Sequence, residues 1–185
     1  MDSDQVLVKR TQQGDTRAFE VLVIKYQQQV FSLIYRLTND RQVVEDLAQD
    51  IFHNAYRAIQ NFQGKSSFFT WLYRITVNTC INHTKHQRTR RAVTSIEENV
   101  YGDHPASFET IDGPERAMEN KELANQIAEA MSSLSEDKRT IILLRDLEGL
   151  SYEQIADIMG CPIGTVRSKL FRAREKMQSK LRAYL

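Results

Sequence analysis

The sequence contains few cysteines and no long apolar run. Only two cysteines, Cys80 and Cys161, occur among the 185 residues. Two thiols cannot build the disulfide framework of a small secreted domain, so they favour a reducing compartment. No stretch reaches the roughly 18 apolar residues that a membrane-spanning helix needs, and the acidic start, residues 1–4, is unlike a signal peptide. We therefore expect a protein of the cytoplasm.

Patterns typical of catalysis are also lacking. The chain has only 7 glycines, with no glycine-rich phosphate loop, no carboxylate cluster in its basic regions and no nucleophile–base pair. Cys80, His83 and His86 are three residues apart, but on a helix the third side chain points away from the first. A zinc site needs four convergent ligands, or three and a water. The sequence therefore predicts no enzymatic activity, no metal site and no cofactor.

Apolar residues recur every three or four positions, and no alternating strand pattern occurs anywhere in the sequence. Asp15 is a fitting N-cap for a helix whose apolar residues share one face, and Ser135 is a fitting N-cap in the C-terminal part. The expected helices in the N-terminal part are 6–12, 16–37, about 42–60 and about 68–85. The pattern predicts an all-α protein of two small helical bundles.

The net charge of +1 conceals an uneven distribution. Residues 1–90 hold 12 basic and 8 acidic side chains (+4), residues 91–118 hold 2 and 6 (−4), and residues 119–185 hold 11 and 10 (+1). The middle segment lacks periodicity and contains Pro105 and Pro114. We interpret it as a flexible acidic linker between two domains. Its acids either keep the segment soluble or imitate a nucleic acid inside a basic channel.

A helix-turn-helix is predicted within residues 149–174. Ser151 and Gln154 have the spacing of a capping box, and Gly160 followed by Pro162 supplies the corner between two helices. The second helix combines an apolar stripe with a cationic face, because seven Lys and Arg and one acid, Glu175, follow residue 163. Such a helix enters the DNA major groove.

A solvated amphipathic helix is the alternative for this segment, since a charged face is often only a soluble one. Phe171 favours DNA, because it stands among the cations and away from the apolar stripe. An aromatic ring at such a position is suited to contact a base edge or a thymine methyl group.

Residues 51–96 contain no acidic side chain, but they hold seven Lys or Arg and seven aromatic residues. Within them Trp71, Arg74, Asn78 and Asn82 share one predicted helix face. Aromatic and cationic side chains together are typical of single-strand binding, in which stacking contributes about 1–3 kcal/mol per base. Some of the aromatic residues are expected in the core instead, namely Tyr56 and at least one of Phe68 and Phe69.

An acidic cluster, formed by Glu45, Asp46 and Asp50 with Gln49, lies on the third predicted helix. Like charges four residues apart destabilise a helix by a few tenths of a kcal/mol, so local stability does not explain the cluster. Placement near the helix N-terminus, where the macrodipole favours acids, is one explanation. A docking face for a basic partner is the other.

Several segments, in fixed order, resemble the sigma-70 family of transcription initiation factors. The length and the two-domain layout are similar to its extracytoplasmic-function group, and the sigma-E type is the most similar. The resemblance covers nearly the whole chain except the linker. The matching segments are Asp-Leu-Ala-Gln-Asp at 46–50, Phe-Thr-Trp-Leu-Tyr-Arg-Ile at 69–75, Leu-Ser-Tyr-Glu-Gln-Ile-Ala at 150–156 and Gly-Thr-Val-Arg-Ser at 164–168.

The resemblance implies a role for each part of the chain. Residues 1–90 would be sigma region 2, which binds core polymerase and opens the −10 element, and residues 119–185 would be region 4, which reads the −35 element. The linker, 91–118, would pass near the polymerase active-site channel. The implied core-binding residues are Asp46, Gln49 and Asp50. The implied −10 residues are Phe62, Gly64, Lys65, Ser66, Trp71, Arg74, Asn78 and Asn82. The implied −35 residues are Thr165, Arg167, Ser168, Phe171 and Arg172.

The function implied by the resemblance is promoter-specific initiation by RNA polymerase. The implied partners are the polymerase core, through its β′ clamp and β flap, promoter DNA as −35 duplex and −10 single strand, and an anti-sigma factor. In this family the anti-sigma factor is often anchored in the inner membrane, where it holds the sigma factor at the cytoplasmic side. The alternative is a helix-turn-helix regulator that does not join the polymerase core. It would explain residues 119–185 only.

Overall fold

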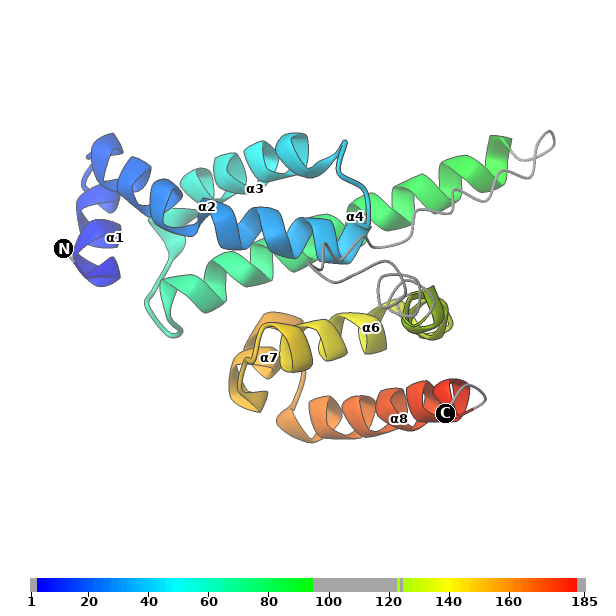
Figure 1. The fold of residues 1–185 in the computed structure, drawn as a ribbon. Helices are drawn as coiled ribbons and strands as arrows, with labels where there is room; N and C mark the ends of the chain where they lie inside the picture. The colour runs from blue at the N-terminus through cyan, green and yellow to red at the C-terminus, as the bar shows by residue number, and fades with distance from the viewer. Residues whose placement is uncertain (1–2, 95–122, 124, 183–185) are drawn as a thin grey trace, which may run out of the picture. The chain divides into compact units, whose positions relative to one another are not determined.

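The computed structural model describes residues 3–94, 123 and 125–182. These residues are helical or in short connections, and no strand occurs among them, as the sequence predicts (Figure 1). The chain divides into two compact units, the first built on residues up to 94 and the second on most of the residues from 125 onward. In the described ranges, no helix is long and apolar enough to cross a bilayer.

The N-terminal unit has four α-helices around one core. α2 is its central helix, because it packs against α1, α3 and α4. The elements are α1 (Asp4–Gln12), α2 (Thr16–Thr38), α3 (Val44–Ala58), the short 3-10 helix η1 (Ile59–Asn61) and α4 (Phe68–Thr94).

Apolar stripes of α2, α3 and α4 meet to form this core. Val30 of α2, Ile51 of α3 and Leu72 of α4 are completely buried. α2 begins where the sequence predicts, because the Asp15 carboxylate accepts hydrogen bonds from the backbone N–H groups of Arg17 and Ala18. The pKa of Asp15 lies below its usual value, mainly because its carboxylate accepts a hydrogen bond from Arg10. The N-cap prediction is confirmed.

α4 is longer than predicted. The sequence predicts its end near residue 85, but the helix continues to Thr94. Residues 86–94 contain no glycine or proline that would end it, and the arginines and Ala92 are good helix formers. Residue 90, the predicted end of the first domain, therefore lies inside this helix. The acidic linker falls mostly on residues 95–118, which lie outside the described part of the chain.

The C-terminal unit is also built from helices. α6 packs against α8, and the α8 residues Val166, Leu170 and Ala173 are buried. Ser135 occupies the N-cap position of α6, but its side chain makes no capping hydrogen bond, contrary to the prediction. The elements are a helical stretch at 125–132, α6 (Glu136–Ile142), the π-helical turn η2 (Leu143–Leu147), α7 (Tyr152–Met159) and α8 (Ile163–Leu181).

The helix-turn-helix consists of α7 and α8, as predicted. The backbone N–H of Ser151 donates to Gln154 Oε1 at 2.9 Å, and the N–H of Gln154 donates to Ser151 Oγ at 3.2 Å. These reciprocal bonds are the predicted capping box at the start of α7. Gly160 has a φ of 60° at the corner, a conformation that glycine adopts without strain.

Candidate nucleic-acid interface

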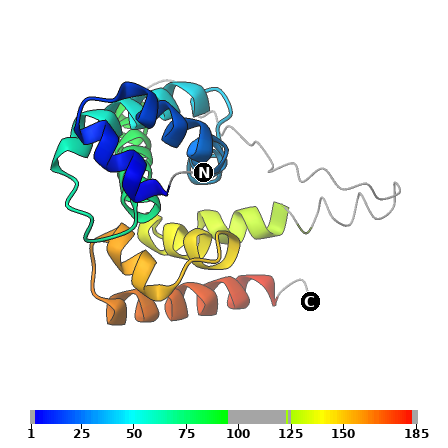
Figure 2. The ribbon, with the colours of Figure 1, turned by 90° about the vertical axis from the view of Figure 1, so that its left-hand side faces the viewer.

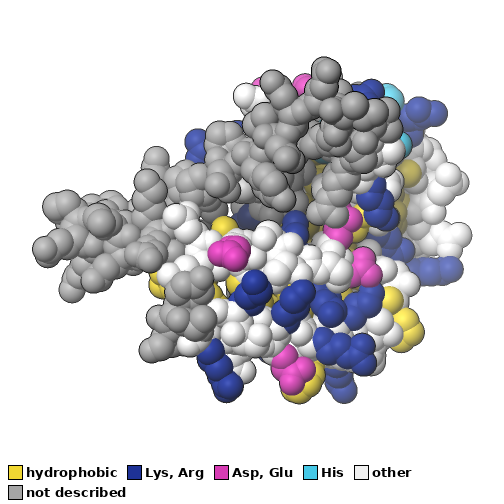
Figure 3. All heavy atoms as spheres, turned by 90° about the vertical axis from the view of Figure 1, so that its right-hand side faces the viewer, with side chains coloured by type: hydrophobic (Ala, Val, Ile, Leu, Met, Phe, Trp, Pro, Cys, Tyr) yellow, Lys and Arg dark blue, Asp and Glu magenta, His cyan; other side chains and the backbone are white. Residues whose placement is uncertain are grey.

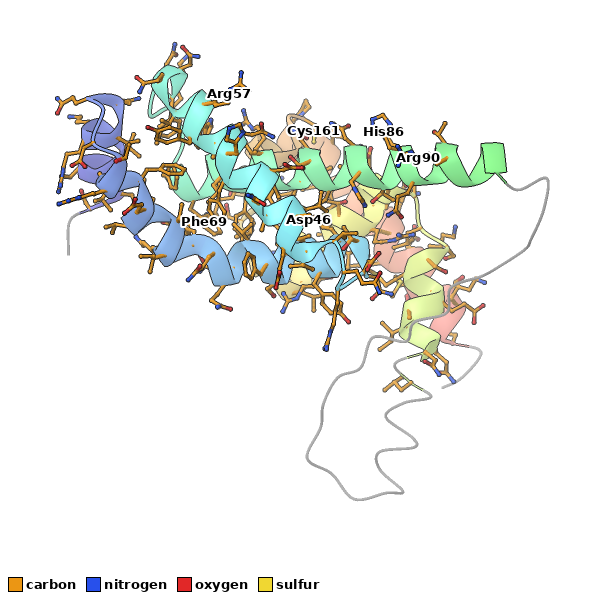
Figure 4. All side chains as sticks on the ribbon, turned by 90° about the horizontal axis from the view of Figure 1, so that it is seen from above. Asp46, Arg57, Phe69, His86, Arg90 and Cys161 are labelled. Carbon is orange, nitrogen blue, oxygen red and sulfur yellow. The ribbon has the colours of Figure 1, made fainter. Side chains whose placement is uncertain are left out.

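The predicted acidic face lies on the solvent side of α3. Asp46, Gln49 and Asp50 are all exposed, whereas Leu47 and Ile51 on the other side of the same helix are buried. Figure 4 shows Asp46 near one end of α3 and Arg57 near the other. The exposed acids near the start of α3 therefore form a continuous patch that the core packing does not use.

An apolar groove borders this acidic patch. It has a volume of about 620 Å³ and lies between α2 and α3. Tyr56 lines it and is 39% exposed, with its ring 5.0 Å from that of Phe19. The prediction that Tyr56 is a core residue is therefore wrong, because the ring faces the groove. Glu45 and Gln49 also line the groove, so acidic and apolar surfaces adjoin. Such a surface fits a basic amphipathic helix.

The loop from 62 to 67 joins η1 to α4. Gly64 has a φ of 70°, which permits the reversal of the chain, and Lys65 is exposed. Ser67 ends the loop, since its Oγ accepts a hydrogen bond from the Thr70 N–H at 3.0 Å. This bond satisfies one of the free N–H groups at the start of α4. The loop therefore has a fixed end at its junction with α4.

Three aromatic rings pack together at the base of the loop. The Trp71 ring centroid lies 5.0 Å from that of Phe62 and 5.6 Å from that of Phe68. Phe68 is buried, which confirms that at least one of the Phe68 and Phe69 pair belongs to the core. Trp71 is partly buried against the same core. Its predicted contact with DNA stays a prediction, and the ring already has a structural role.

The other residues of the predicted single-strand face differ in exposure. Asn78 and Asn82 are exposed on α4. Arg74 is half-buried, and its Nε is buried without a hydrogen-bond partner among the described residues. Farther along α4, Figure 4 shows His86 and Arg90 beyond the part that packs against α2 and α3. The predicted face is thus continuous on the outer side of α4 only from Asn78 onward.

A cavity of about 610 Å³ lies between the loop and α1. Figures 1 and 2 both show α1 beside this loop, and α1 also contacts η1. Phe62, Gly64 and Ser66, which are all predicted DNA-binding residues, line the cavity on the loop side. α1 lines the other side with Lys9 and Gln12 among others. The sequence gives no signal for this role of α1, because about 50 residues separate it from the loop.

The predicted reading face of α8 is accessible. Phe171 is 64% exposed, Arg167, Ser168 and Arg172 are exposed, and Thr165 is half-buried. Figure 3 shows Lys and Arg side chains gathered over the lower part of one face. Guanidinium groups can donate two hydrogen bonds to guanine, and an aromatic ring can contact a thymine methyl group.

Three other cations of α8 bind within the C-terminal unit. Lys169 Nζ lies 2.6 Å from Asp137 Oδ2, and Lys176 Nζ donates to the Ser133 carbonyl at 2.5 Å. Arg174 pairs with Asp146. These contacts hold α8 against α6 and its neighbours. Some cations of α8 therefore bind within the unit, and others are left exposed to solvent.

Tyr152 contacts the predicted DNA-binding residue Arg167, and the sequence analysis does not single it out. The Arg167 guanidinium lies 5.6 Å from the Tyr152 ring centroid, and that of Arg145 lies 4.9 Å from it. Cation–π contacts of this kind are worth about 0.5–1 kcal/mol at exposed sites. The contact restrains Arg167 at the first turns of α8. A tyrosine directly after the capping serine was the available signal.

Cys80, His83 and His86 do not form a metal centre in the structure. Cys80 is buried, and burial raises the pKa of its thiol to about 12. His83 Nε2 is hydrogen-bonded to the Gln87 amide at 2.9 Å. Within the described ranges, no three His, Cys, Asp or Glu side chains are close enough to hold a metal ion.

Comparison with known proteins gives matches to both units. Residues 22–90 match the family described as Sigma-70 region 2, and residues 124–177 match Sigma-70, region 4. The chain is 46% identical to the RNA polymerase sigma-H factor of Pseudomonas aeruginosa, over 100% of this chain and 96% of that protein. It is 45% identical to the ECF RNA polymerase sigma-E factor of Escherichia coli K12, over 97% and 94% respectively.

A solved structure has a similar fold. It is the co-crystal structure of the sigma factor RpoE in complex with the anti-sigma factor NepR from Bartonella quintana. The TM-score is 0.65 at 27% sequence identity, and the match covers 89% of this chain and 96% of that chain.

Proposed function

Because the chain belongs to the extracytoplasmic-function group of the sigma-70 family, we propose that it joins the RNA polymerase core and directs it to specific promoters. α8 reads the −35 element as duplex, and the loop at 62–67 with α4 captures the opened −10 strand. The chain supplies recognition and positioning, and the chemistry of RNA synthesis belongs to the polymerase.

The observation that carries this proposal is the presence of two separate DNA-suited surfaces in one chain. The exposed face of α8, with Arg167, Phe171 and Arg172, has the geometry for a major groove. The loop cavity is lined by Phe62 and has room for an extruded base. A protein that binds duplex and single strand at once is suited to promoter opening.

Core binding is assigned to the acidic face of α3, with Asp46, Gln49 and Asp50 against the β′ clamp of the polymerase. Acidic side chains beside an apolar groove complement a basic helical surface in both charge and shape. A second contact, between the C-terminal unit and the β flap, would place α8 over the upstream promoter.

Two further assignments follow from the family. An anti-sigma factor controls the chain by covering its polymerase-binding surfaces, and the complex in Bartonella quintana is an example of such a pair. The chain acts in the bacterial cytoplasm, where the polymerase is, and a membrane-anchored inhibitor would hold it at the inner membrane.

A helix-turn-helix regulator without polymerase binding is the weaker alternative. It would use α7 and α8 but would leave the exposed acids of α3 and the loop cavity without a function. The match of residues 22–90 to sigma region 2 also counts against it.

Transcription from the Escherichia coli polymerase core tests the proposal. We expect the polymerase core together with this chain to start RNA synthesis at defined promoters. The substitution Asp50→Arg should abolish core association, because it places a cation in the acidic face. Gel filtration measures the association, and circular dichroism checks the fold. Glu20→Arg, at an exposed acid of α2 outside the groove lining, is the matched control. Normal holoenzyme formation by Asp50→Arg would refute the docking assignment.

A further inference from the structure

We propose that Gln12 positions the loop at 62–67, and that α1 forms the second wall of the pocket that holds an extruded base. The inference rests on the proposed function and deepens it, because it names a residue outside the predicted DNA-binding set that determines base selectivity. Gln12 lines the pocket, but its amide N–H groups are engaged with the loop backbone and not offered to a base. It acts through the loop.

The amide of Gln12 holds the point where the chain leaves η1. Its Nε2 donates to the Ile59 carbonyl at 2.8 Å and to the Phe62 carbonyl at 3.0 Å. The Ile59 carbonyl, at the start of η1, also accepts the Phe62 N–H at 3.0 Å, and Phe62 is the C-cap residue of this short helix. The side chain is half-buried, so water competes only partly for these bonds. One side chain thus fixes both the end of η1 and the first residue of the loop.

α1 is itself held firmly, so it can serve as a frame. At its N-terminal end the Asp4 carboxylate accepts hydrogen bonds from Lys25 Nζ and from the Tyr26 hydroxyl, both at 2.5 Å. Burial raises the pKa of Tyr26 to about 12, so its hydroxyl remains a donor at neutral pH. Leu7 and Val8, on the inner face of the helix, are buried. The N-terminal end and the inner face of α1 are therefore attached to the rest of the N-terminal unit.

The cavity between α1 and the loop has the chemistry that a nucleobase requires. Its volume, about 610 Å³, is within the usual range for ligand pockets. The partly exposed Phe62 offers apolar ring surface for stacking, and Lys9 on the α1 side offers a cation for a base edge or a phosphate. Gly64 lines the cavity without a side chain. Selectivity for one base requires that the distance between α1 and the loop stays fixed.

Gln12→Glu removes the donor and keeps the shape. A carboxylate cannot donate to the two carbonyls and repels them, so the loop loses its attachment to α1. We expect binding of an opened −10 strand to weaken roughly tenfold and base preference at the pocket position to disappear. Binding of −35 duplex should not change. Gln13→Glu, which makes the same charge change at the exposed neighbour, is the control.

The experiment uses holoenzyme assembled from polymerase core and the full chain, with a library of single-stranded DNA randomised over six positions. Sequencing of the bound fraction gives the base preference at each position. The wild-type and Gln13→Glu chains should show the same preference. Gln12→Lys, which retains a donor, should restore part of the preference, whereas Gln12→Leu should not. Retention of the wild-type preference by both Gln12→Glu and Gln12→Leu would overturn the inference. No preference with the wild-type chain would instead reject the proposed −10 function, and the inference with it.

Trp71 supplies an independent readout in the free chain. It is the only tryptophan, and its ring contacts Phe62, whose carbonyl Gln12 binds. Loosening of the loop by Gln12→Glu should shift its emission to longer wavelength at unchanged helix content. An unchanged emission spectrum together with unchanged base preference would mean that Gln12 does not position the loop.

Discussion

Trp71 in the N-terminal unit and Phe171 in the C-terminal unit occupy opposite environments, although both stand among cations in the sequence. Trp71 packs between Phe62 and Phe68, whereas Phe171 is 64% exposed. Composition therefore does not separate a core aromatic residue from a surface one. The phase of each residue on its helix does.

The phase is visible in the neighbours of each residue. Trp71 lies three residues after Phe68 and four before Ile75, and both of these belong to or pack against the core of the N-terminal unit. Phe171 follows the buried Leu170 by one residue, which turns it about a quarter of a turn away from the buried stripe. The two aromatic residues thus predict different consequences when they are removed.

Trp71→Ala should have the largest effect, on the stability of the N-terminal unit. Removal of a partly buried ring from an aromatic cluster costs about 3 kcal/mol in the free energy of unfolding. Urea unfolding followed by circular dichroism measures it, and Trp71→Phe should recover much of the loss. Unchanged stability together with lost single-strand binding would mean that the ring serves DNA and not the core.

Arg172→Ala should come next, with an effect on DNA and not on the fold. The exposed guanidinium is assigned to a base edge, so its loss should cost about 1–3 kcal/mol in promoter binding and relax the −35 preference. Run-off transcription on −35 variants gives the measurement. Lys180→Ala removes an exposed cation farther along α8 and should leave the preference intact. Unchanged selectivity with Arg172→Ala would reject α8 as the reading helix.

Phe171→Ala should change stability least, by less than about 0.5 kcal/mol, because the ring makes little core contact. Binding to a −35 fragment should still weaken, most at a position where the ring meets a thymine methyl group. Fluorescence anisotropy with matched thymine and uracil fragments detects this contact. A loss of stability as large as that of Trp71→Ala would remove the contrast between the two residues.

Local patterns predicted much of this fold. The Asp15 cap and the capping box of Ser151 and Gln154 depend on residues two or three apart, and both occur as predicted. The buried stripe of α2 follows from its helical period alone. The position of the acidic face on the outer side of α3 follows in the same way.

Contacts between distant segments could not be predicted. The bond from Gln12 to the Ile59 carbonyl joins residues 47 apart, and nothing near Gln12 signals it. The expectation that Tyr56 belongs to the core is wrong, because its ring borders the groove between α2 and α3 and stays 39% exposed. The sequence predicts too early an end for α4, because residues 86–94 show little apolar periodicity. Their helix propensity was the better guide.

The internal contacts of Lys169, Arg174 and Lys176 have a consequence for how DNA binding responds to ionic strength. Each phosphate neutralised by a cation releases condensed counterions, and this release makes affinity fall as salt rises. Lys169 and Arg174 already face a carboxylate within the unit, so they neutralise fewer DNA phosphates than unpaired cations would, and fewer counterions leave the DNA. The affinity of α8 for duplex should therefore be less sensitive to salt than its number of cations suggests, so recognition depends more on base contacts than on net charge.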